Sequence, residues 1–315
     1  MKKLNVTFDG IHDDTGFLHS FAKSLACAVQ HSPWPEATED IIATSGFAFR
    51  MWAREDLCSS ATSIWDWGNK KPWVESGGFA CGYVGRYWGQ KKLEKEKRLE
   101  AIEMTKQSID RGIPAVCWNV GIPEWGLLIG YDDKAKTFAA LSPCQGQKEC
   151  EIPYKKLGNG ELPILSVLTL SGKSEKPRED ILRDTMRLAV THLEGNDRDA
   201  PGCIQIQGLA VYPALTGRFE ADDPEFALCW NMGYLLGTYG ALKYYAWKYF
   251  EKMGQVELAS LYQVVYEAWI EAFRLKTNED VGKSEVRREI AVHLREAWEK
   301  EQRALALLVK ENEND

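Results

Sequence analysis

Hydrophobic positions recur with helical spacing in the first part of the chain. Between Phe17 and Gln30, apolar residues occupy positions 17, 18, 21, 22, 25, 26 and 29, which is the spacing of one helix face. The preceding Asp-Asp-Thr-Gly offers side chains that cap a helix start. A second helix is predicted within residues 38–52, with a break at Gly46. A third is predicted over residues 91–111, ending at Arg111-Gly112.

Short apolar runs separated by turn residues follow this third helix. They cover residues 114–120, 124–133, 137–143, 149–154 and 163–170, and residues 83–89 add a further short strand. Their close spacing leaves no room for crossover helices, so it predicts an antiparallel sheet rather than βαβ units. Helices followed by such a sheet indicate the α+β class.

The pattern becomes helical again after a polar segment at residues 171–180, which we take as the domain boundary. Helices are predicted over residues 178–195, 224–254, 255–276 and 284–311. The second of these is apolar on nearly every face, and Gly233, Gly237 and Gly240 would let another backbone approach it closely. We therefore expect an α+β domain at residues 1–172 and a helical bundle domain at residues 173–315.

Composition narrows the range of partners. The 315 residues carry a formal net charge of -7, which opposes nucleic acid as a partner. The basic run at residues 90–98 alternates with Glu and is typical of a solvated helix face. The chain starts without a signal-peptide pattern and has no apolar run of ~18 residues, so we expect a cytoplasmic protein with no membrane partner.

Cysteine spacing gives no reason to expect a metal. None of the eight cysteines forms a C-x-x-C pair or has a histidine at zinc-finger spacing. We expect no metal and no cofactor, and most of these cysteines read as small buried side chains.

A carboxylate interrupts the apolar pattern at the turn between the first two runs of the sheet. Glu124 stands beside Trp125 in the stretch IPAVCWNVGIPEWGLLIGYDD, residues 113–133, where the second strand begins. In a regular strand these neighbouring side chains would point to opposite faces. One interpretation makes Glu124 a pocket residue; another pairs it with Arg50, Arg54 or Arg86; a third leaves it exposed in the turn.

The order of elements and several residues around this turn resemble a known family. The pattern contains Gly112, Pro114, Gly130, Tyr131, Asp132, Pro143, Ile152, Pro153, Tyr154 and Leu157. Over roughly residues 10–170 the chain resembles bacterial papain-like proteins related to the N-terminal domain of butirosin biosynthesis protein H. It resembles the bacteriocin-leader peptidases more distantly. The resemblance implies a papain-like fold and an acyl-transfer cleft.

The resemblance also implies which positions carry the chemistry. In the family, a cysteine at the start of the first helix is the nucleophile, and a histidine at the start of a strand is the general base. The family's His-Cys aligns here with His19 and Ser20, and the strand histidine aligns with Glu124, or with Trp125 if the register slips by one. No histidine lies between residues 32 and 191. We therefore expect a degenerate cleft that binds a small molecule or a peptide without Cys–His catalysis.

Two alternatives remain at this point. Cys58, in a loop of small residues, could be the nucleophile of a working thiol acyltransferase, amidase or peptidase, with His19 as its partner. A structural role, with a homodimer formed through the bundle, is the other. Eight of the twelve tryptophans lie at or before Trp125, which favours an aromatic core with a few residues lining a pocket. The candidate ligand-binding residues are Trp65, Trp67, Asn119, Trp125 and Asp132.

Overall fold

The computed structural model describes residues 1–63, 67–144, 148–197, 202–221 and 224–313. The chain divides into two compact units, and each takes three stretches of the sequence. The first unit comprises Met1–Ile11, Ser20–Ile42 and Trp67–Lys176. The second unit comprises His12–His19, Ala43–Asp66 and Pro177–Asp315.

The chain enters the second unit for the last time between Lys176 and Pro177. This point lies close to the boundary predicted at residues 172 and 173. The sequence pattern did not indicate that residues 12–19 and 43–66 would join the second unit. From the sequence, their apolar side chains were expected to pack in the core of the first domain, because that domain surrounds them along the chain. In the structure they pack in the second unit, whose helices come much later in the sequence.

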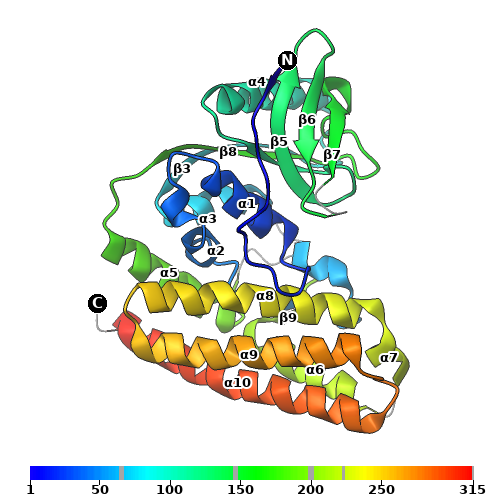
Figure 1. Ribbon diagram of the computed structural model, residues 1–315, viewed down its shortest axis with the longest axis vertical. Coiled ribbons are helices and arrows are strands. Elements are labelled where there is room, and N and C mark those ends of the chain that lie inside the picture. The colour runs from blue at the N-terminus through cyan, green and yellow to red at the C-terminus, as the bar shows by residue number, and fades with distance from the viewer. Residues whose placement is uncertain (64–66, 145–147, 198–201, 222–223, 314–315) are drawn as a thin grey trace. The chain divides into compact units, whose positions relative to one another are not determined.

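An antiparallel sheet forms the centre of the first unit (Figure 1), which confirms the predicted α+β class. The strand order is β3-β8-β4-β5-β6-β7, and β1 pairs with β5 at Gly130 and Tyr131. The strands are β1 (Lys2–Lys3), β3 (Phe79–Arg86), β4 (Ala115–Trp118), β5 (Trp125–Asp132), β6 (Thr137–Leu141), β7 (Glu149–Pro153) and β8 (Leu165–Lys173).

Helices cover both faces of this sheet at its central strands β4 and β5, which are apolar and buried on both sides. On one face, Ala101 and Ile109 of α4 join a buried cluster with Cys117 and Leu128. On the other, Phe21 of α1 meets Trp125 with ring centroids 5.2 Å apart. The helical elements are α1 (Ser20–Gln30), η1 (Pro35–Ala37), α2 (Asp40–Thr44), η3 (Trp67–Asn69), α3 (Lys70–Ser76), η4 (Lys91–Leu93), α4 (Glu94–Asp110) and η5 (Tyr154–Lys156).

The first helix starts later than its hydrophobic pattern indicates. It was predicted from residue 17, but α1 begins at Ser20. Phe17 belongs to the second unit, where its ring contacts Tyr234 and Phe273, each with centroids 5.8 Å apart. The apolar residue at position 17 thus serves a different core, although its spacing fits the helix.

The second unit is a bundle of helices, as predicted for this part of the chain. The helical elements are η2 (Ser59–Ser63), α5 (Arg178–Leu193), η6 (Gly208–Ala210), α6 (Val211–Glu220), α7 (Pro224–Leu228), α8 (Trp230–Lys252), α9 (Val256–Asn278) and α10 (Ser284–Glu313). The single helix predicted over residues 224–254 is divided at Cys229, whose backbone leaves the helical region (φ -56°, ψ 142°) and whose Sγ accepts from Asn231 N. A short antiparallel pair, β2 (Trp52–Ala53) and β9 (Ile206–Gln207), completes the unit.

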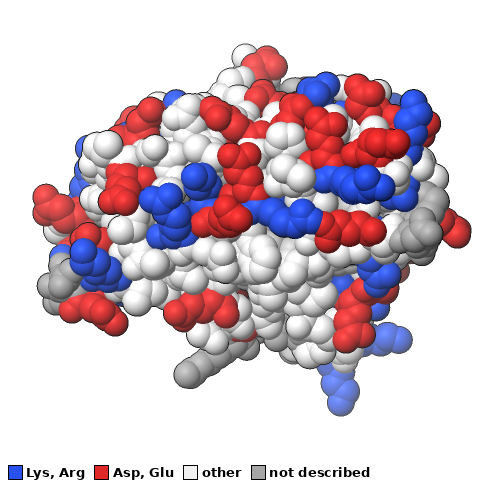
Figure 2. Space-filling view, turned by 90° about the horizontal axis from the view of Figure 1, so that it is seen from below, with Lys and Arg blue, Asp and Glu red and all other residues white. Residues whose placement is uncertain are grey.

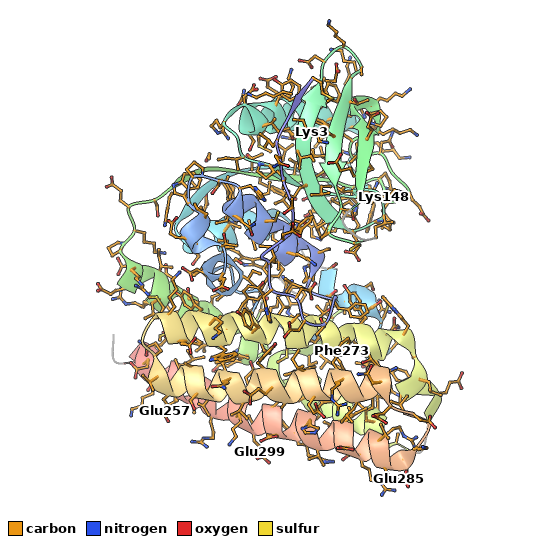
Figure 3. The ribbon with its side chains drawn as sticks, in the orientation of Figure 1. Lys3, Lys148, Glu257, Phe273, Glu285 and Glu299 are labelled. Carbon is orange, nitrogen blue, oxygen red and sulfur yellow. The ribbon has the colours of Figure 1, made fainter. Side chains whose placement is uncertain are left out.

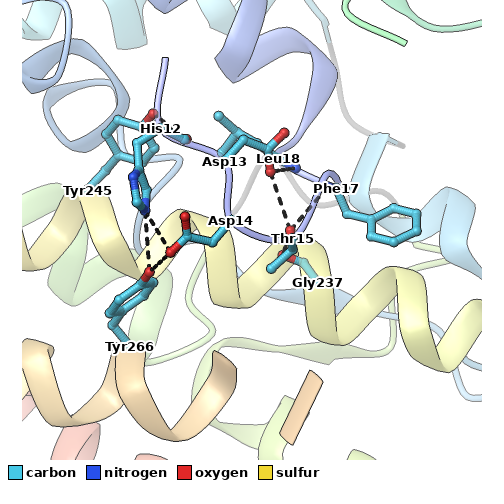
Figure 4. Close-up of polar contacts among 9 residues, drawn as sticks. All are labelled: His12, Asp13, Asp14, Thr15, Phe17, Leu18, Gly237, Tyr245 and Tyr266. Carbon is cyan, nitrogen blue, oxygen red and sulfur yellow. Dashed lines mark hydrogen bonds and ion pairs between the residues drawn. The ribbon is translucent and has the colours of Figure 1, made fainter. Parts of the chain in front are cut away.

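The segment from residue 12 to 19 lies along α8 and α9 (Figure 4). Tyr266 donates to the Asp14 carboxylate at 2.5 Å, and the ring of His12 stacks on Tyr244 with centroids 3.6 Å apart. The Thr15 hydroxyl donates to the carbonyl of Gly237 at 3.0 Å. These contacts make the segment an integral part of the bundle.

Acidic and basic side chains are intermixed on the face of the molecule seen in Figure 2. In the second unit, acidic and basic side chains also pair within one helix, as Arg274 does with Glu271 at 2.6 Å. Each exposed pair of this kind stabilises a helix by about 0.3–0.5 kcal/mol. On this face, therefore, the charges do not form a field of one sign.

Candidate functional site

Ser20 and Glu124, far apart in sequence, form a direct hydrogen bond in the first unit. Ser20 is the first residue of α1, and Glu124 immediately precedes β5. The Ser20 Oγ donates to the Glu124 Oε2 at 2.5 Å, and it also accepts from the Trp125 backbone N at 3.3 Å. The structure thus brings together two of the candidate residues, and the serine hydroxyl is engaged both as donor and as acceptor.

Glu124 belongs to the turn rather than to the strand, which changes the expected direction of its side chain. Its N–H donates to Ile122 O at 2.7 Å, and its carbonyl accepts from Asn119 N at 2.9 Å and Val120 N at 3.2 Å. Because strand alternation does not apply to this residue, both Glu124 and Trp125 can reach α1. The expectation that they point to opposite faces held for a regular strand and therefore does not apply to Glu124.

Burial sets the protonation behaviour of Glu124. Loss of water raises the pKa of this carboxyl above 4.5, and the hydrogen bond from Ser20 partly opposes that shift by favouring the charged form. In the part of the chain that the structure describes, the ion pair considered for Glu124 does not form. Arg50 donates to Thr62 O, Arg54 pairs with Asp56, and Arg86 donates to Gly158 O.

Three tryptophans pack together next to the Ser20–Glu124 pair. The ring centroids of Trp67, Trp118 and Trp125 lie 4.7 to 5.1 Å apart. Lys70 is fully buried, and its Nζ lies 3.2 Å from the Trp125 ring centroid and 3.3 Å from Ser166 Oγ. Aromatic faces and a hydroxyl therefore stabilise this ammonium group away from water.

The tryptophan cluster is part of the core. Trp125 is 1% exposed and Trp67 is 6% exposed, so the structure buries both residues that were predicted to contact a ligand. Trp118 is the member of the cluster that also borders a pocket. Trp65 lies outside the described residues.

A pocket of about 460 Å³ opens beside the turn that carries Glu124. The β4–β5 turn forms one wall, β7 forms another, and the segment after η5 closes it. Its lining residues are Trp118, Asn119, Gly121, Glu151, Ile152, Pro153, Lys156, Leu157, Gly158, Asn159, Gly160 and Glu161. Asn119, a predicted ligand-binding residue, thus lines a pocket in the structure.

Close packing between Asn119 and Gly160 shapes this pocket. Asn119 has a left-handed backbone (φ +65°), and a Cβ at position 160 would lie only 2.1 Å from its Nδ2. Glycine at 160 therefore lets the asparagine amide lie against the opposite wall. Asp132, also predicted to contact a ligand, instead accepts from Lys134 N and Ala135 N at 2.8 and 3.0 Å within a turn.

The residues of the alternative thiol mechanism lie in the second unit. His19 is 2% exposed, and its Nε2 contacts Thr62 O at 3.1 Å and Ser63 Oγ at 3.2 Å. The Cys58 Sγ contacts Ser60 Oγ at 3.2 Å. These contacts join neither residue to the other, and the roles predicted for them stay predictions.

Three other cysteines are poor nucleophiles because of burial. Loss of water raises the pKa of Cys27, Cys81 and Cys117 to about 12, so each remains a neutral thiol near pH 7. Their reading as small buried side chains agrees with this environment.

Sequence reasoning did not single out Lys70 or the pocket wall at residues 156–161. Lys70 is the first lysine of the stretch at residues 58–73, which has no strong period, and nothing in that stretch indicates a buried cation. The Gly-Asn-Gly at 158–160 is a turn signal that could have indicated a loop, but not the side chain packed against it.

No protein-family model matches this chain, and no curated protein matches its sequence. Among the described residues, no group of His, Cys, Asp and Glu side chains is placed to hold a metal ion. Nor does the described part of the chain contain a helix with the length and apolar character needed to cross a bilayer.

Proposed function

We propose that the first unit is a papain-like domain that binds a small molecule or a peptide and has lost acyl-transfer chemistry. The observation that carries this proposal is the 2.5 Å hydrogen bond between Ser20 Oγ and Glu124 Oε2. It joins the start of α1 to the start of β5. The papain-like resemblance assigns the nucleophile and the general base to these two positions.

The chemistry of the pair supports binding rather than catalysis. An acyl transfer needs a group that becomes a strong nucleophile when a base takes its proton. A serine hydroxyl is a far weaker acid than a thiol, and a carboxylate is a weaker base than an imidazole. Burial raises the pKa of Glu124, but the Ser20 hydroxyl is already engaged with two partners. The pair is therefore suited to fixing α1 against β5.

Reactivity of individual cysteines tests this proposal. Iodoacetamide labelling is followed against pH by mass spectrometry of each cysteine-containing peptide. In the unmodified protein we expect no cysteine to label as a thiolate well below pH ~8.5. In the variant Ser20→Cys with Glu124→His, we expect the thiol introduced at position 20 to label at lower pH than an ordinary thiol, because an imidazole then lies beside it.

A matched control separates a restored pair from an accessible thiol. Ser20→Cys combined with Glu124→Gln places the same thiol at the same position without an imidazole beside it. This control should label slowly. If the unmodified protein instead has one fast cysteine, and Cys58→Ala removes it, the protein is a thiol enzyme using Cys58 and the proposal fails.

A further inference from the structure

The pocket beside the β4–β5 turn carries charges of both signs on opposing segments. Glu151 on β7 and Glu161 in the closing segment contribute two carboxylates, and Lys156 in η5 contributes one ammonium group. All three are exposed. The buried Arg86 does not line the pocket, but it donates to the carbonyl of Gly158, which does. Two negative groups and one positive group therefore line the cavity.

The walls between these charges offer apolar and main-chain contacts. Trp118, Ile152 and Leu157 border the pocket, and the first and last of these are otherwise buried. Within the described sheet, β7 is the last strand of the order, so part of its main-chain N–H and C=O groups face away from β6. An extended chain can add to such an edge through main-chain hydrogen bonds.

Size limits what can enter. A volume of about 460 Å³ falls in the range of sites for small ligands, ~300–1,000 Å³. A long peptide does not fit within it, whereas a few residues do. A ligand that carries both an ammonium group and a carboxylate would find an oppositely charged side chain for each among the lining residues.

We propose that this pocket binds a short zwitterionic peptide of two or three residues. Glu151 and Glu161 face its ammonium group, Lys156 faces its carboxylate, and an apolar side chain lies against Leu157. This inference rests on the proposed binding function of the first unit and names the class of ligand.

Calorimetric titration with four simple probes tests the charge requirement. The probes are alanyl-leucine, leucyl-alanine, N-acetyl-alanyl-leucine and alanyl-leucine amide. We expect at least one free dipeptide to bind, and we expect removal of either terminal charge to weaken binding by about two- to fivefold, as for a single exposed ion pair. In NMR spectra the amide signals of Gly121 and Gly160 should move on addition of the free dipeptide.

Variants assign each end of the ligand. Glu151→Gln with Glu161→Gln should abolish the preference for a free amino group, and Lys156→Gln should abolish the preference for a free carboxylate. Lys155 is an exposed neighbour that does not line the pocket, so Lys155→Gln is the control and should change neither preference.

Three results overturn the inference. They are equal binding of free and blocked dipeptides, dependence on only one of the two end groups, and no binding of any probe at millimolar concentration. The labelling experiment on Cys58 and position 20 is independent of these titrations. A fast native cysteine would refute the proposed function, whereas failed titrations with unreactive cysteines refute only the zwitterionic ligand.

Discussion

Lys243 of α8 and Glu301 of α10 form an ion pair inside the second unit, with Nζ and Oε1 2.6 Å apart and exposures of 1% and 0%. Tyr212 donates to the other carboxylate oxygen at 2.6 Å, and Trp269 Nε1 donates to the Tyr212 hydroxyl at 2.8 Å. Lys243 also lies 3.4 Å from the carbonyl of Ala48. Burial lowers the pKa of Lys243, and Glu301 opposes that shift.

Glu301→Gln should destabilise the protein by about 3–5 kcal/mol, because it leaves the buried ammonium of Lys243 without a counter-charge. Replacing both partners, with Lys243→Met and Glu301→Leu, should cost less than the single change because no buried charge remains. The measurement is urea-induced unfolding. Glu299→Gln, at an exposed position on the same helix (Figure 3), is the control and should stay within about 0.5 kcal/mol of the unmodified protein. A single change as mild as this control would contradict the account.

The Glu124 carboxyl should make stability depend on pH. Its pKa in the folded protein is raised above 4.5, so the folded state holds this proton over a pH range in which the unfolded state has lost it. The contribution of the group is therefore fully present below about pH 4.5 and is lost as the pH rises through the folded-state pKa. Glu124→Gln should gain stability relative to the unmodified protein over that rise, by about 1.4 kcal/mol per unit of pKa shift.

The measurement for Glu124 is the free energy of unfolding by urea at a series of pH values from 4 to 8. Glu175→Gln, at an exposed position in the same unit, provides the reference for a carboxylate in water. If the difference between the unmodified protein and Glu124→Gln is the same at all pH values, the carboxyl is not desolvated as described.

Alanine substitution at three glycines of α8 should have three different effects on the stability of the protein. A Cβ at Gly233 meets nothing within 4 Å, so Gly233→Ala should stabilise the protein by about 0.5–1 kcal/mol through helix propensity. At Gly240 the new Cβ would lie 3.3 Å from that of Trp269, which offsets most of the gain. At Gly237 it would lie 2.8 Å from the ring of Phe17 and 3.0 Å from that of Phe273, so Gly237→Ala should destabilise the protein. Thermal unfolding of the three variants gives their order of stability. A Gly237→Ala variant more stable than the unmodified protein would contradict this prediction.

Residues 177–315 should not fold cooperatively on their own. The second unit also contains residues 12–19 and 43–66. From the latter, the backbone N of Trp52 donates to the Tyr239 hydroxyl at 3.0 Å, and β2 pairs with β9. We expect the isolated fragment to show helical circular dichroism without a sharp unfolding transition, whereas the full chain unfolds cooperatively. A sharp transition in the fragment would show that the two N-terminal segments are dispensable.

Periodicity predicted the elements of this fold more reliably than their grouping. The strand runs after residue 113 were predictable because they are short apolar runs between turn residues, and the helices after residue 178 were predictable from their apolar positions and length. In α10 the sequence predicts an apolar stripe at Val286, Ile290, Leu294, Ala297, Ala304, Leu305 and Leu308. Five of these residues are buried, whereas Val286 and Leu305 are only partly buried. Glu301 lies in the same stripe and is buried. A charged residue at a core position was therefore the signal in the sequence that pointed to the buried Lys243–Glu301 ion pair.

The candidate site was predictable only at the level of which elements approach one another. The positions of Ser20 and Glu124 came from the order of elements, and the structure places them in contact. The pocket could not be predicted, because it depends on the left-handed backbone of Asn119 and its packing against Gly160, which lies 41 positions further along the sequence. Packing between residues so far apart in the sequence produces no periodic pattern of apolar positions.

The alternation of the chain between its two units bears on how the protein is made and how it can evolve. Residues 12–19 and 43–66 leave the ribosome long before the helices that they pack with, so they must stay unpaired until α8, α9 and α10 have been synthesised. For the same reason, no single break in the gene separates one complete unit from the other. Recombination that moves domains between proteins would have to carry this pair as a whole.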